Sequence, residues 1–146
     1  MSCGNEVSET DSAPRCKLCN GLLEVRHRPP EISASQLIQR FTERRGGPPG
    51  ATSSGVWRFR EIVLPSAESV VSYPEGNTPL LHRVALDRWA GVDHLLLKHE
   101  GHNPTGSFKD RGMTVGVTQA VRVGARAVAC ASTGNTSASL AAYAAQ

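Results

Sequence analysis

The feature that most constrains the fold is an alternation of apolar runs and helix-like segments between residues 93 and 146. The runs DHLLLKHE (93–100) and ARAVACAS (125–132) are short and apolar, as expected of buried strands. Between them, residues 108–123 have helical spacing and stop at Gly124, and a second helix begins within TSASLAAYAAQ. This strand–helix–strand–helix order predicts an α/β fold, a parallel sheet with flanking helices.

Burial follows from the same pattern. We expect Cys130, inside AVACA, to be a buried small hydrophobe. The chain ends at Gln146 inside the last expected helix, and a parallel sheet of two or three strands would leave edges and one face uncovered. We therefore expect a fragment, or a chain whose partner is missing.

The helix at 108–123 should bury one apolar face, made of Met113, Val117, Ala120, Val121 and Gly124.

The segment before residue 56 differs in composition from the rest. Residues 1–15 are polar and acidic and suggest a disordered lead-in. Residues 16–55 form an extension with a Cys-x-x-Cys turn, a short strand up to residue 28, a helix at 34–45 and the flexible linker GGPPGATSSG. The main folded domain is expected to begin at residue 56 and to be truncated at 146.

Composition excludes several classes of protein. Of the 146 residues, 39% are hydrophobic and 20% charged, which is typical of a globular chain. No apolar run approaches the roughly 20 residues of a membrane span, and the polar start lacks a secretory signal, so we expect a cytoplasmic protein. The net charge of +3 includes no basic stripe with aromatics, which argues against nucleic-acid binding.

Two loops have the composition of ligand-binding loops. GHNPTGS follows the first expected strand and STGNTS follows the second, and each leads into a helix. Ligands of α/β sheets bind beyond the carboxyl ends of the strands, and the free N–H groups of a helix start attract anions. Both loops are therefore candidate parts of one binding cleft.

Lys109 lies in the first turn of the helix that follows GHNPTGS. A cation is disfavoured at the positive end of the helix dipole, so this position favours the neutral amine. A neutral lysine amine is a nucleophile that can bond covalently to an aldehyde cofactor. A solvated surface lysine is the alternative role for Lys109, and the flanking sequence favours the nucleophile.

Three blocks in order carry a family resemblance: EGNTPLL, KHEGHNPTGSFKDRG and ASTGNTSASLAAYAA. Together they resemble the threonine synthases, within the fold-type II family of pyridoxal-phosphate enzymes. The similarity covers residues 56–146 well, and CKLCNGLLEV and SGVWRFREI extend it towards the N-terminus. The resemblance implies a tryptophan synthase β-like fold, incomplete in this chain, and pyridoxal 5′-phosphate as cofactor.

The resemblance also implies roles for particular residues. Lys109 would hold the cofactor covalently and then move protons at the substrate carbons. Phe108 would pack near the cofactor ring, and Asn135 would hydrogen-bond its 3′-oxygen. Helix capping is an alternative role for Ser132 and Thr136, and it is compatible with contact to a ligand. The substrate carboxylate would be bound by Ser132, Thr133, Asn135 and Thr136.

The implied reaction converts O-phosphohomoserine and water to threonine and phosphate, in a homodimer when the chain is full length. We read Asp110 and Arg111 as mainly structural, with Arg111 pairing a carboxylate elsewhere. Sister enzymes of the threonine dehydratase or cysteate synthase type are alternatives, as is a truncated non-catalytic chain. The family's loop for the cofactor phosphate lies beyond these 146 residues, so we expect no turnover from them alone.

Cys16 and Cys19 have the spacing of a zinc knuckle. A closed zinc site needs four ligands, and neither Cys3 nor His27 has the spacing of a zinc ribbon. From spacing alone we therefore expect a turn without metal, and purified protein with well under one zinc per chain.

Overall fold

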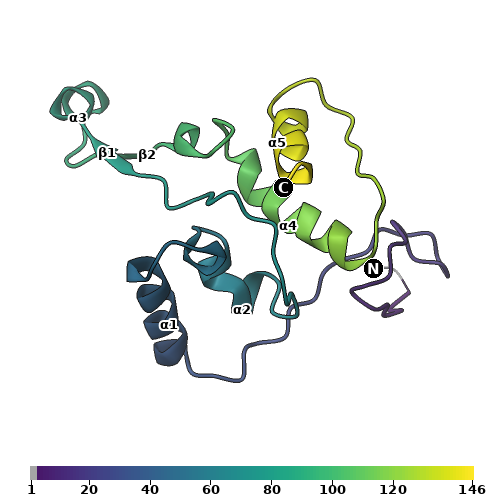
Figure 1. Ribbon diagram of the computed structural model, residues 1–146. Helices are drawn as coiled ribbons and strands as arrows, with labels where there is room; N and C mark the ends of the chain where they lie inside the picture. Colours follow the sequence, from purple (N-terminus) through teal and green to yellow (C-terminus); the bar gives the residue numbers. More distant parts are fainter. Residues whose placement is uncertain (1–2) are drawn as a thin grey trace.

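The computed structural model describes residues 3–146. Helices α4 and α5 lie side by side near its centre, while β1, β2 and α3 project at one end (Figure 1). No helix of the described part is long and apolar enough to cross a membrane. In chain order the elements are α1 (Ala34–Gly46), η1 (Ala51–Ser53), η2 (Trp57–Phe59), α2 (Arg60–Val63), β1 (Leu80–His82), α3 (Val84–Ala90), β2 (Leu96–Lys98), η3 (Glu100–His102), α4 (Lys109–Arg122) and α5 (Asn135–Ala144).

The expected helices are confirmed. Helix α1 begins after Ser33, whose side chain accepts a hydrogen bond from the backbone N–H of Gln36 while the Gln36 side chain bonds back to Ser33. This reciprocal capping box satisfies two N–H groups that the helix leaves free. The other two helices, α4 and α5, start and stop within about two residues of the bounds that turn and cap residues predict.

The expected parallel sheet is not confirmed, because the one sheet in residues 3–146 is the antiparallel pair β1–β2, with Leu80 opposite Lys98. Strand β2 lies inside the predicted run 93–100 but is exposed rather than buried. Residues 125–132 form no strand, and Cys130 among them is exposed, so both expectations were wrong for this structure. A strand needs a hydrogen-bonded neighbour, and no other described segment pairs with 125–132.

The buried face of α4 is more polar than expected. Its buried residues are Asp110, Thr114, Val117 and Thr118, whereas Val121, predicted to be on the core face, is 60% exposed. Thr114 accepts a hydrogen bond from Trp57 Nε1 at 2.7 Å and donates to a backbone carbonyl, that of residue 71, at 2.6 Å. The hydroxyls pair with groups that would otherwise be buried without partners, which decides the orientation of the helix.

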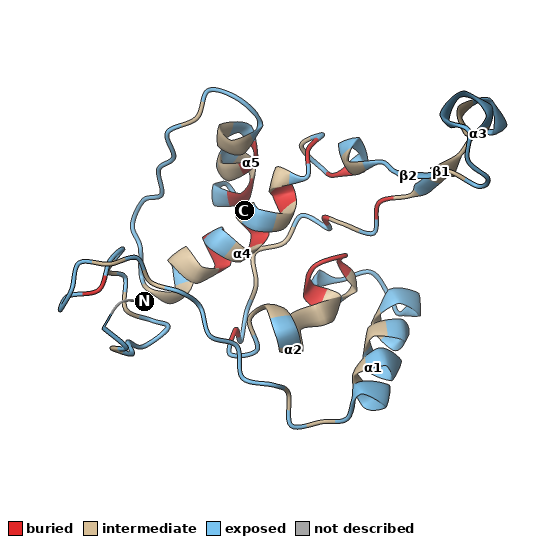
Figure 2. Ribbon diagram, turned by 180° about the vertical axis from the view of Figure 1, so that it is seen from behind, coloured by how far each residue is buried: buried red, intermediate tan, exposed pale blue. Residues whose placement is uncertain are grey.

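The apolar core is small and lies where the segment around η2 meets α4. Val56, Trp57 and Ala67 are its buried members, and Val115 of α4 packs against them. Figure 2 shows the buried positions gathered around α4, α5 and the neighbouring loops, while α1 and α3 are largely exposed. Most stability of the described part must therefore come from the contacts around α4.

The N-terminal Cys-x-x-Cys segment forms a tight turn. The Asn20 N–H donates to the Cys16 carbonyl, and the Cys16 N–H donates to the Gly21 carbonyl, both at 2.9 Å. Backbone N–H groups of Cys19 and Leu18 also hydrogen-bond the Cys16 sulfur and lower the pKa of its thiol. The short strand expected after this turn is reduced to a single bridge at residue 22, because no longer partner segment lies beside it.

Candidate active site

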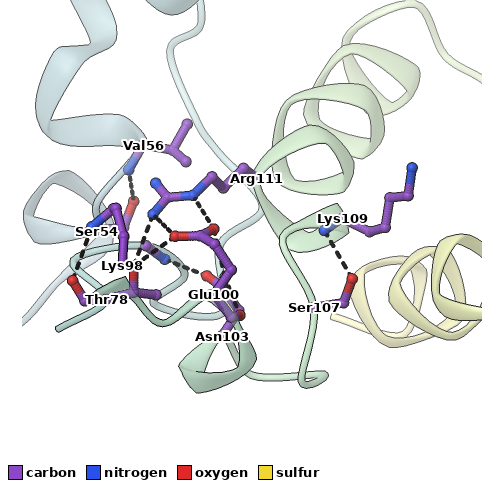
Figure 3. A network of polar contacts seen from close by, with 10 residues as sticks. Ser54, Val56, Thr78, Lys98, Glu100, Asn103, Ser107, Lys109 and Arg111 are labelled. Carbon is purple, nitrogen blue, oxygen red and sulfur yellow. Dashed lines mark hydrogen bonds and ion pairs between the residues drawn. The ribbon is translucent and has the colours of Figure 1, made fainter. Parts of the chain in front are cut away.

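Lys109 is the first residue of α4 and follows a loop with buried polar residues. Asn103 and Ser107 of that loop are buried, and the Lys109 N–H donates to the Ser107 hydroxyl at 3.2 Å. The Lys109 side chain points away from the polar network behind it (Figure 3). Its Nζ lies 4.6 Å from the centroid of the Phe108 ring. The loop therefore fixes the backbone of Lys109 and leaves the amine outside the network.

The sequence has three lysines, all within the described residues, and their amines differ in what they bind. Lys17 pairs with the Asp11 carboxylate at 2.8 Å, and Lys98 donates to the backbone carbonyl of Thr78 at 2.9 Å. In residues 3–146, the Lys109 amine makes no hydrogen bond or ion pair and lies over the Phe108 ring. Of the three, the Lys109 amine is the one whose bonding atom is available to a ligand.

Asp110 ties the lysine loop to both central helices. Its carboxylate is fully buried and accepts hydrogen bonds from the backbone N–H of Thr105 at 2.8 Å and from the Thr105 hydroxyl. It also accepts a hydrogen bond from the Ser139 hydroxyl of α5 at 2.5 Å. Sequence analysis read Asp110 as structural, and these contacts support that role. Three hydrogen bonds therefore fix the position of the residue that follows Lys109.

Arg111 pairs with a carboxylate, as predicted, and its partner is Glu100. Arg111 Nε and one terminal nitrogen donate to the two Glu100 oxygens at 2.7 and 2.9 Å (Figure 3). The Thr78 hydroxyl donates to Glu100 at 2.6 Å, and the Asn103 amide donates to it at 3.1 Å. These contacts together lower the pKa of Glu100 to about 2, and the hydrogen bonds from Arg111 have the largest effect. The network fastens the loop before Lys109 to the segment that precedes β1.

This network predicts a pH-dependent contribution to stability. Because the folded-state pKa of Glu100 lies below its unfolded value, its stabilising effect is complete above about pH 4.5 and is lost as the pH falls towards 2. Arg111→Gln should lower the free energy of unfolding by about 1 kcal/mol at pH 7, a value that allows for partial exposure. Urea unfolding at pH 7, 4 and 2.5 measures the difference in free energy of unfolding between the unmodified chain and Arg111→Gln.

We expect this difference in free energy of unfolding to become smaller as the pH falls. Arg44→Gln, which breaks the separate Arg44–Glu61 pair, is a matched comparison because Arg44 likewise lowers the pKa of Glu61 to about 2. A gap for Arg111→Gln that is constant from pH 7 to 2.5 would contradict the assignment of this effect to Glu100.

The second loop leads directly into α5. Gly134 is the N-cap residue of α5 and no side chain caps it, so the capping role considered for Ser132 and Thr136 is not observed. Ser132 instead accepts a hydrogen bond from the Gly134 N–H at 3.2 Å and shapes the turn. Thr133 and Asn135 are exposed, and Thr136 is half-buried. The helix start thus presents free N–H groups and polar side chains, the donor set that suits a carboxylate.

The structure brings the two loops into one region through their helices. The Asp110–Ser139 hydrogen bond joins the first turn of α4 to the second turn of α5. Among the described residues no hydrogen bond connects Lys109 itself with Ser132, Thr133, Asn135 or Thr136. Phe108, expected near a cofactor ring, is 57% exposed beside Lys109. The predicted residues therefore lie at the starts of two helices that the Asp110–Ser139 hydrogen bond joins, and among the described residues they do not form a closed site.

The face of α4 next to Lys109 has room for a ligand. Gly112 and Gly116 follow Lys109 by three and seven residues, so all three lie along one side of the helix. A Cβ atom added at either glycine would meet no atom within 4 Å. An available amine, an open strip of helix surface and a nearby free helix start together fit an aldehyde cofactor that carries an anionic group.

Comparison with known proteins gives the family. Residues 71–146, just over half of the chain, match the family model described as pyridoxal-phosphate dependent enzyme. The chain belongs to this family. The match begins just before the EGNTPLL block and contains Lys109, both loops and helices α4 and α5. Pyridoxal phosphate is thus the cofactor of the family to which this chain belongs.

Curated relatives refine this within the family. The chain is 44% identical over 147 residues to "Threonine synthase" of Methanocaldococcus jannaschii and 43% identical over 146 residues to that of Methanosarcina acetivorans. Each alignment covers 100% of this chain but 34% and 33% of the relative. A threonine synthase of Mycobacterium tuberculosis is 60% identical over 76 residues, 52% of this chain and 21% of the relative. The chain thus spans about a third of the length of the first two relatives.

Sequence reasoning missed the residues that hold the lysine loop in place. Glu100 and Asn103 lie inside the block KHEGHNPTGSFKDRG, where a carboxylate and an amide beside a turn are a usable signal for loop hydrogen bonds. Thr78, in EGNTPLL, gave no such signal. Its role depends on a contact with Glu100, 22 residues away, that only the fold creates.

Proposed function

We propose that this chain is part of a threonine synthase, a pyridoxal-phosphate-dependent lyase that converts O-phosphohomoserine and water to threonine and phosphate. The observation that carries the proposal is Lys109 at the start of α4, whose amine has no hydrogen-bond or ion-pair partner within residues 3–146, while the neighbouring Asp110 and Arg111 both do. The similarity to threonine synthases along the whole chain supports the choice within the family. We also propose that the working protein is a homodimer in the cytoplasm.

The residues divide the chemistry between them. The bound cofactor would supply an electron sink for negative charge that develops on the substrate carbons. Lys109 Nζ would act as the base that carries protons between those carbons. The start of α5, with Ser132, Thr133, Asn135 and Thr136, would orient the substrate through its carboxylate. Phosphate leaves from the terminal carbon and water adds its oxygen at the neighbouring carbon, which balances the reaction.

An assay with two substrates tests the proposal. Protein that contains this chain, supplied with pyridoxal phosphate, should release phosphate from O-phosphohomoserine and form threonine in equal amounts. Release of ammonia and a 2-oxo acid from threonine, without phosphate release from O-phosphohomoserine, would instead identify a dehydratase.

The 146 residues alone should give no turnover in the same assay. The family resemblance implies that the loop for the cofactor phosphate lies outside them, so the cofactor would lack that anchor. Threonine formation by the isolated chain, above that of a Lys109→Ala control, would contradict this expectation.

A further inference from the structure

Three cysteine thiols gather at one point of the N-terminal segment. The Sγ atoms of Cys3, Cys16 and Cys19 all lie within 4.8 Å of one another, and those of Cys3 and Cys16 are 3.6 Å apart. Among the described residues, this group contains no histidine or carboxylate. Cys3 is 13 residues from Cys16 in the sequence, so the turn at 16–21 and the course of the preceding segment are both needed to form the cluster.

The spacing of the sulfur atoms fits a shared metal. A disulfide requires an S–S distance of about 2.05 Å, much shorter than the separation of Cys3 and Cys16. Tetrahedral zinc with Zn–S bonds of about 2.3 Å places its sulfur ligands about 3.8 Å apart. The observed 3.6 Å is close to that value, and the third thiol lies within reach of the same centre.

The surroundings suit thiolate ligands. The Cys16 side of the cluster is buried, with 2% of the residue exposed, and the Asn5 amide nitrogen lies 3.8 Å from its sulfur. Backbone N–H groups of the knuckle turn also point to that sulfur. Donors of this kind hold a sulfur ligand in position and stabilise its negative charge, as the outer shell does in metal sites.

We propose that Cys3, Cys16 and Cys19 bind one zinc ion as three thiolates, with a water molecule completing the tetrahedron. Thiolates select zinc over magnesium and calcium, which prefer oxygen ligands. The expectation of a metal-free turn depended on sequence spacing, which gave Cys3 no reason to approach the pair. The structure supplies that third thiol, and this proposal replaces the earlier expectation.

The site would fasten the N-terminal segment onto the catalytic part. Glu9, between Cys3 and Cys16, pairs with Arg122 in the last turn of α4 at 2.7 Å. Its backbone carbonyl accepts a hydrogen bond from Gln119 of the same helix. Figure 1 shows the described N-terminal segment, in purple, beside this end of α4. Zinc that joins Cys3 to the knuckle would close a loop around Glu9, so its binding energy would contribute to holding this contact.

Metal analysis of the purified chain tests the proposal. The 146-residue chain, expressed with zinc and purified without chelator, should contain about one zinc per chain. Cys3→Ser, Cys16→Ser and Cys19→Ser should each weaken zinc binding by at least about 10-fold. Cys130→Ser is the matched control, because Cys130 is exposed, lies outside the cluster and should leave the zinc content unchanged.

Cobalt gives a second measurement that does not depend on variants. Cobalt(II) bound to the unmodified chain should show near-ultraviolet sulfur-to-metal charge transfer with the intensity of three thiolates.

Alkylation of the thiols is a third measurement. Cys130 should react with iodoacetamide at the same rate with and without metal, while bound metal should protect Cys3, Cys16 and Cys19 from the reagent. Zinc far below one per chain, no charge-transfer band, or a disulfide in the freshly purified chain would overturn the proposal.

Discussion

Replacement of Lys109 by alanine will abolish covalent attachment of pyridoxal phosphate and lower the activity of the complete enzyme by at least about 10³-fold. The reason is that Lys109 Nζ is the only one of the three lysine amines that no protein acceptor engages in residues 3–146. Incubation with pyridoxal phosphate, reduction with borohydride and peptide mass spectrometry should place the label on Lys109, leaving Lys17 and Lys98 unlabelled.

The same variant should fold normally. The Lys109 side chain makes no hydrogen bond to any described residue, so Lys109→Ala should change the free energy of unfolding by no more than about 0.5 kcal/mol. Lys17→Ala is the matched control, since it removes an exposed lysine and should keep both the label and the activity. A label that stays after Lys109→Ala, or that moves to Lys98, would show that the site is elsewhere.

The largest expected effect on stability belongs to Asp110. Asp110→Ala should lower the free energy of unfolding by about 3 kcal/mol, because it removes a fully buried carboxylate that accepts three hydrogen bonds. The Thr105 N–H and the hydroxyls of Thr105 and Ser139 would be left without their partner. Urea unfolding of the chain, followed by circular dichroism, measures the change.

Two further variants make this result specific. Asp93→Ala removes an exposed acid and should alter the free energy of unfolding by less than about 0.5 kcal/mol. Ser139→Ala removes one of the three donors and should cost about 1 kcal/mol. If Asp110→Ala were as mild as Asp93→Ala, the carboxylate would not be what joins the lysine loop to α5.

Sequence reasoning worked best where structure is set by neighbours in the chain. The helix expected at 34–45 is α1, which begins at the Ser33–Gln36 capping box, and Gly124, predicted as a stop, lies just beyond the end of α4. Helix α4 begins at Lys109 because turn-forming residues precede it. Hydrogen bonds of caps and turns span only a few residues, so a short stretch of sequence contains all the groups involved.

The same reasoning was wrong where the partner lies far along the chain. Residues 125–132 have the composition of a buried strand, but they have no neighbouring strand in the described part and Cys130 is exposed. Val121 has the spacing of a core residue, yet α4 turns Thr114 inward. An apolar pattern records what a segment is suited to bury, and the pairing partner decides whether it is buried.

The sequence by itself determined the helices, the two polar loops and the place of Lys109 at a helix start, because local hydrogen bonding and turn geometry need only adjacent residues. It also determined the family, through blocks whose order and composition are specific. Only the tertiary structure decided that Arg111 pairs with Glu100, that Asp110 joins α4 to α5, and that Cys3 meets Cys16. Each of these contacts joins residues 11 to 29 positions apart, and which partners meet across such loops depends on how the whole chain packs.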